Sequence, residues 1–107
     1  MFYKIKTKLI IRRANSFNEA DRSKIANMVN IYVESIGESA KTKNVEEYDI
    51  FIENKLSFYQ KEVRAVMENT SFFVWNSLLA LICISHLKGD KKNAELIIQW
   101  VYDNKTN

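Results

Sequence analysis

Polar and apolar residues alternate at the start of the chain. Over residues 3–11 one side of the alternation is mostly apolar and the other is mostly lysine. A period of two with β-branched residues is typical of a strand with one buried face, so we expect a strand here, inside a basic arm of residues 1–13. The alternative is a helix with Phe2, Ile5 and Leu9 on one side. In the strand, one face would hold Tyr3, Ile5, Thr7, Leu9 and Ile11, and the other Lys4, Lys6, Lys8 and Ile10.

From residue 16 onwards, apolar residues recur every three or four positions, which is the period of an amphipathic helix. Ser16 and Glu19 have the spacing of a capping box, so this helix should begin at Ser16. Gly37 follows the apolar stripe and suits the left-handed residue that ends many helices. A polar link of residues 38–43 would then lead to the next element. The stripe consists of Ile25, Met28, Val29, Tyr32, Val33 and Ile36.

A second helical stripe is the most regular in the chain and extends to Val66. Asn44 is the expected cap of this helix, because its short polar side chain can accept a hydrogen bond from an amide of the first turn. Residues 69–71 should separate this helix from a third. The stripe consists of Val45, Tyr48, Ile52, Leu56, Tyr59, Val63 and Val66.

The third helix, over about residues 72–88, is apolar on nearly every face, which is typical of a central helix. Gly89 should end it, and Asp90 or Asn93 should begin a last helix. The predicted fold class is therefore mainly α: a small bundle of about four helices preceded by a basic N-terminal strand or arm.

Length and composition agree with a single helical domain. The 107 residues are close to the commonest domain size, so we expect one domain over 1–107, with the bundle in residues 16–104. There is no proline, and Gly37 and Gly89 are the only glycines, whereas all-β folds need many tight turns. Cys83 is the only cysteine, and the basic arm interrupts any signal-peptide pattern. We therefore expect a cytoplasmic protein with no disulfide and no membrane span.

The residue types that carry catalysis or bind metals form no constellation in this sequence. Two glycines 52 positions apart cannot form a phosphate-binding loop. Cys83 and His86 could share a helix face, but a metal site needs three or four ligands and a Cys–His nucleophile needs an orienting third group. We expect no enzymatic activity, no catalytic or metal-binding residues and no cofactor.

The positive charge of the chain is concentrated in the basic arm. The net charge is +3, and residues 1–13 carry five cations and no acid, which leaves −2 for the remainder. Cations interleaved with aromatic residues suit phosphate contacts and base stacking. Lysines on an edge strand also discourage further strand pairing. We favour the edge-strand interpretation, because the acidic remainder would repel nucleic acid beyond the reach of the arm.

A small chain that is rich in aromatic residues and has no catalytic motif is typical of proteins that act by binding. We expect a non-catalytic protein-binding module that occludes or bridges a partner protein, as inhibitors, immunity proteins and host-takeover proteins do. The partner would be another protein or a second copy in a homodimer; the alternative is a nucleic-acid-binding protein that uses the basic arm. The many Lys, Ile and Asn residues (12, 12 and 11) indicate an AT-rich coding sequence, a composition that phages, plasmids and low-GC bacteria share. The candidate partner-binding residues are Tyr3, Ile5, Leu9, Arg12, Arg13 and Trp100.

Overall fold

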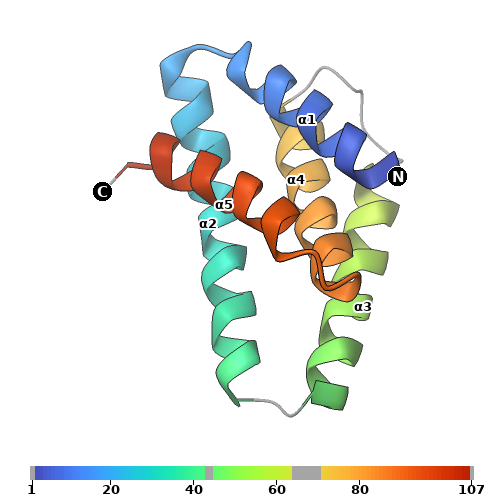
Figure 1. Ribbon diagram of the computed structural model, residues 1–107. Helices are drawn as coiled ribbons and strands as arrows, with labels where there is room; N and C mark the ends of the chain where they lie inside the picture. The colour runs from blue at the N-terminus through green and yellow to red at the C-terminus, as the bar shows by residue number, and fades with distance from the viewer. Residues whose placement is uncertain (1, 43–44, 64–70, 107) are drawn as a thin grey trace.

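The beginning of the chain is a helix. The computed structural model describes residues 2–42, 45–63 and 71–106, and their side chains over 3–37, 46–56 and 71–106. Helix α1 spans Phe2–Asn15 (Figure 1). The strand predicted for residues 3–11 is therefore wrong, and no strand occurs within the described ranges. The helical alternative is correct for this segment.

The inner side of α1 differs from the side that either interpretation of the sequence assumed. Ile5 and Leu9, expected to face the core, are both exposed. The inner positions are spaced by three and four residues, which is the period of a helix. They are Tyr3, which is half-buried, and the buried residues Thr7, Ile10 and Ala14.

Helix α2 spans Glu19–Thr42, and its cap lies two residues later than expected. Its cap is Asn18, whose side-chain oxygen accepts a hydrogen bond from the Asp21 N–H over 2.8 Å. The Ser16 hydroxyl instead donates to the Arg13 carbonyl, at the end of α1. The capping box predicted at Ser16 is therefore wrong, and a neighbouring Asn takes the same role.

Gly37 does not end α2. The helix continues to Thr42, so the predicted link 38–43 is helical over residues 38–42. Among the described residues, positive φ occurs at Gly89 alone. Glycine permits a left-handed turn but does not require one, and its cost inside a helix is only about 1 kcal/mol relative to alanine.

Helix α3 spans Val45–Val63, and helix α4 spans Ser71–Leu87. The caps predicted at Asn44 and in residues 69–70 lie outside the described residues. Helix α4 contacts each of the other four helices, and most of its residues are buried. Figure 1 shows it in the middle of the structure, coloured yellow to orange. Its central position confirms the prediction from its composition.

The turn after α4 confirms the sequence prediction at Gly89. This glycine has a φ of +67°, and its N–H donates to the His86 carbonyl over 3.1 Å. The Asp90 N–H donates to the Ser85 carbonyl over 2.8 Å, which completes a Schellman motif. Asp90 then caps helix α5, Lys91–Asn104.

The described residues form a compact all-α structure of five helices, where about four helices and a strand were predicted. Its radius of gyration is 13.1 Å, close to the roughly 13 Å of a compact domain of about 100 residues. In the part of the chain that the structure describes, no helix has the length and apolar character needed to cross a bilayer. The core lies around α4 and draws on all five helices.

Candidate partner-binding surface

A network of hydrogen bonds fixes the inner side of α1 against α4 and α5. Asn93 donates from Nδ2 to Thr7 Oγ1 over 3.0 Å and to Ser85 Oγ over 2.7 Å. Each hydroxyl then donates to the carbonyl four residues before it, Thr7 to Tyr3 and Ser85 to Leu81. Thr7, Ser85 and Asn93 are buried, so the protein itself satisfies these polar groups.

The turn between α4 and α5 holds the first turn of α1. The Tyr3 hydroxyl donates to Asp90 Oδ2 over 2.8 Å, and Lys4 Nζ lies 3.3 Å from the same oxygen. Asp90 accepts hydrogen bonds from the Tyr3 hydroxyl and from the backbone N–H of Asn93, and Lys4 lies nearby. Together these groups lower the pKa of Asp90 below its ordinary value. The bond to a carboxylate raises the pKa of Tyr3. The segment that the sequence presented as a basic arm is therefore a positioned helix.

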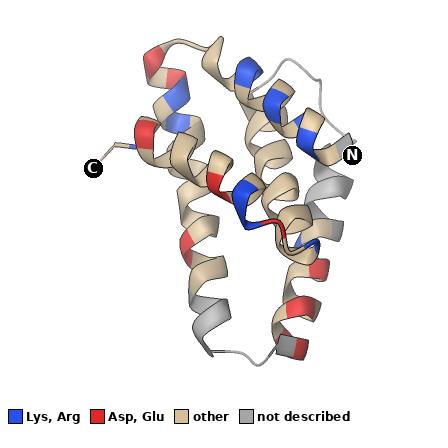
Figure 2. Ribbon diagram, viewed as in Figure 1, with Lys and Arg blue, Asp and Glu red and all other residues tan. Residues whose placement is uncertain are grey.

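The outer side of α1 combines two exposed aliphatic side chains with cations. Ile5 is 59% exposed and Leu9 is 54% exposed, and residues four apart are neighbours on a helix surface. The cations around them are exposed as well. Figure 2 shows Lys and Arg positions following one another along α1. We call this surface the α1 outer face; it consists of Ile5, Lys6, Lys8, Leu9, Arg12 and Arg13.

Four of the six predicted partner-binding residues belong to the α1 outer face, and the other two do not. Tyr3 is half-buried and bonded to Asp90. Trp100 is only 6% exposed, and its Nε1 donates to Asn15 Oδ1 over 2.7 Å, which links α5 to the end of α1. Both side chains hold α1 in place, so we leave them out of the candidate surface.

Lys6 and Lys8 belong to the α1 outer face although the sequence reasoning did not select them. A strand would have placed them on the side opposite Ile5 and Leu9. In the helix, Lys8 follows Ile5 by three residues and Lys6 precedes Leu9 by three, so each lysine is beside an aliphatic residue. Helical spacing around Leu9 was the signal that could have identified them.

The two residues considered for metal or thiol chemistry lie in α4. Burial raises the pKa of the Cys83 thiol to about 12, so the thiol is protonated at neutral pH and is a poor nucleophile. Burial also lowers the pKa of His86, whose ring meets that of Tyr48 edge-on with 6.1 Å between centroids. Within the described ranges, no three His, Cys, Asp or Glu residues are grouped so that they could hold a metal ion.

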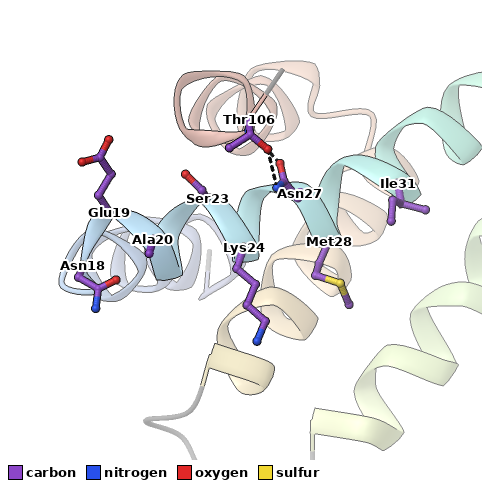
Figure 3. A pocket seen from close by; sticks show the side chains of 9 residues that line it. All are labelled: Asn18, Glu19, Ala20, Ser23, Lys24, Asn27, Met28, Ile31 and Thr106. Atoms are coloured by element: carbon purple, nitrogen blue, oxygen red, sulfur yellow. Dashed lines mark hydrogen bonds between the residues drawn. The ribbon is translucent and has the colours of Figure 1, made fainter.

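An open pocket of about 860 Å³ lies at the beginning of α2 (Figure 3). Residues from the segment 18–31 line it, together with Thr106. Two hydrogen bonds of 2.9 Å join Asn27 and Thr106 and so attach the segment after α5 to α2. Of the described residues that line the pocket, Glu19 and Lys24 alone are charged. The other lining residues are uncharged: Asn18, Ala20, Ser23, Asn27, Met28, Ile31 and Thr106.

Known proteins do not add a function to this geometry. Comparison with models of protein families, with curated proteins and with solved structures finds no match to the chain. The candidate surface must therefore be interpreted from its own residues.

Proposed function

We propose that the protein is a non-catalytic protein-binding module, which occludes or bridges a partner protein through the α1 outer face. The main support is the exposure of Ile5 and Leu9 on a helix whose other side is held by buried hydrogen bonds. Burying an aliphatic side chain contributes about 1.5–3 kcal/mol, so covering two that are more than half exposed would contribute about 2–3 kcal/mol. A helix already held in place also loses little conformational entropy on binding.

The cations of the α1 outer face indicate what the partner must offer. Lys6, Lys8 and Arg12 flank the aliphatic pair, and α1 contains no acidic residue. A partner surface with an apolar centre and carboxylates around it would satisfy both parts of the face. The charges would then act mainly on the rate of association and on its salt dependence, and the aliphatic pair on affinity.

Nucleic acid is the alternative partner, because α1 carries five cations. A phosphate backbone would pair with the lysines and arginines of the face. It would leave Ile5 and Leu9 exposed to water, although these residues lie at the centre of the face. A protein partner uses the whole face, which is why we favour it.

Removing the aliphatic pair without changing the charge tests the proposal. A partner is first captured from a lysate of the source organism, and its affinity is then measured with both proteins purified. The Ile5→Ala, Leu9→Ala variant should bind at least tenfold more weakly, because the apolar contacts are lost. Ile31→Ala is the matched control: Ile31 is 61% exposed but lies on α2, so this variant should bind like the parent protein. Far-UV circular dichroism checks that both variants fold.

Charge neutralisation distinguishes the two classes of partner. For a protein partner, Lys6→Gln with Lys8→Gln should slow association and reduce its salt dependence. For nucleic acid, the same change should remove binding, and the parent affinity should fall by about one log unit per log unit of salt for each phosphate contact. Tight binding of labelled DNA or RNA that persists in Ile5→Ala, Leu9→Ala and disappears in the lysine variant would contradict the proposal.

A further inference from the structure

Helix α3 also exposes an aliphatic residue, but in an acidic setting. Ile50 is 53% exposed, whereas Ile52 is fully buried. Lys55 is five positions from Ile50, and its ammonium group lies 5.5 Å from the Phe51 ring centroid, so it belongs to another side of the helix. The residues one helical turn from Ile50 are exposed. We call this surface the α3 outer face; it consists of Glu46, Glu47, Ile50, Glu53 and Asn54.

The α1 and α3 outer faces have the same arrangement of aliphatic and charged residues, but their charges are opposite. Each has an exposed aliphatic centre, which cations surround on α1 and carboxylates on α3. Both are exposed in the folded chain, and among the described residues α1 and α3 make no contact, so neither face covers the other within one molecule. Figure 2 shows the Lys and Arg positions of α1 and the Asp and Glu positions of α3 in separate parts of the molecule.

We propose that the α1 outer face of one copy of this chain docks on the α3 outer face of a second copy. The inference rests on the proposed role of the α1 outer face as a binding surface, and it identifies a second copy as one of its partners. Ile5 and Leu9 would contact Ile50, and the lysines and arginines would lie against Glu46 and Glu53. Pairing of α1 with α1 would instead place like charges together, which is unfavourable.

This contact joins two different surfaces, so it is heterologous. Each copy that uses its α1 outer face still has a free α3 outer face, and association can continue as a chain or close as a ring. Two helix faces bury less than the roughly 1,200–2,000 Å² of a standard stable interface. Association should therefore be weak, rise with protein concentration, and weaken with salt, because the charges surround the contact at its rim.

Two variants that each damage one face provide the test. The α1 variant, Ile5→Asp with Leu9→Asp, keeps the α3 outer face, and the α3 variant, Ile50→Lys with Glu53→Lys, keeps the α1 outer face. Sedimentation equilibrium at low salt should show the parent growing in average mass with concentration and each variant remaining at the 12.6 kDa of one chain. An equimolar mixture should form a complex of about twice that mass and grow no further, because it has one intact contact. Ile31→Asp is the control and should associate like the parent.

The mixture also shows that both variants are folded, since its complex needs one intact face from each. The inference is overturned if the parent stays monomeric at every concentration, if the α3 variant still associates alone, or if the mixture forms no complex. These outcomes differ from a failure of the proposed function. If the parent is monomeric but Ile5→Ala, Leu9→Ala loses its captured partner, the binding role of α1 stands and self-association alone is wrong.

Discussion

Tyr3 and Asp90 lie 87 positions apart in the chain and are joined by a hydrogen bond of 2.8 Å from the phenolic hydroxyl to Oδ2. The backbone of Asp90 completes the end of α4, and its side chain caps α5. One residue therefore connects three helices. Through its bond to Tyr3, Asp90 also fixes the beginning of α1, the helix whose outer face we propose as the binding surface.

The charge of Asp90 should make stability depend on acid pH. Folding lowers the pKa of Asp90, so its charge stabilises the protein above the ordinary pKa of 3.8, and this contribution is lost as the pH falls through the lower, folded value. Asp90→Asn keeps an oxygen that can cap α5 but removes the charge. We predict that the parent has the higher Tm at pH 7 and that the difference from Asp90→Asn shrinks below about pH 4. Thermal unfolding followed by circular dichroism measures this, and a constant difference down to about pH 2 would argue against it.

The Asn93 side chain should be important for stability although it is polar. Asn93→Ala leaves the buried hydroxyls of Thr7 and Ser85 without their common donor, so we expect a loss of about 1–3 kcal/mol in the free energy of unfolding. Gln99→Ala is the matched control on the same helix, since the hydrogen bond of Gln99 to Asp103 is exposed. It should change stability by about 0.5 kcal/mol or less. Urea unfolding measures both, and equal midpoints for the two variants would show that the network contributes little.

The two glycines should respond in opposite directions to substitution. A Cβ at either position would meet no atom within 4 Å, so backbone conformation alone decides the effect. At Gly89, with φ of +67°, Ala should destabilise by about 1–2 kcal/mol and a β-branched Val by more. At Gly37, inside α2, Ala should stabilise by up to about 1 kcal/mol. Urea unfolding of Gly89→Ala and Gly37→Ala gives the two signs directly, and a neutral Gly89→Ala would mean that the turn adjusts without strain.

The Cys83 thiol should be unreactive in the folded protein. It is fully buried, and burial raises its pKa to about 12, so very little thiolate exists near neutral pH. We predict slow reaction with a chromogenic disulfide reagent at pH 8 and rapid, stoichiometric reaction in concentrated guanidinium chloride. The absorbance time course under the two conditions checks this. Equal rates would show that α4 opens readily in the folded state.

Several parts of the fold could be predicted from the sequence because their signals are local. The apolar residues on nearly every face of α4 indicated a central helix, and the pair Gly89–Asp90 indicated where that helix ends and the next begins. At Ser16 and Gly37 the local signals were misleading. A capping side chain one or two residues away can replace Ser16, and a glycine can remain inside a helix at small cost.

The candidate surface could be predicted only in part. The apolar alternation and the basic charge of the arm indicate Ile5, Leu9, Arg12 and Arg13, but that interpretation assumes a strand with one buried face. Trp100 was selected as an aromatic anchor, and its burial depends on how α5 lies against α1. No window of the sequence contains both of those helices, so local reasoning could not distinguish a surface tryptophan from a core one.

By itself, the sequence determined that the chain is mainly helical, that α4 is its centre and that its beginning is basic. Only the tertiary structure decided that residues 3–11 form a helix and which side of it faces water. The alternation in this segment suits a strand, and Thr7 is a poor candidate for a core position. Its burial becomes favourable because Asn93, 86 positions later, donates a hydrogen bond to it inside the protein. With Thr7 turned inward, the geometry of the helix turns Ile5 and Leu9 outward among the cations.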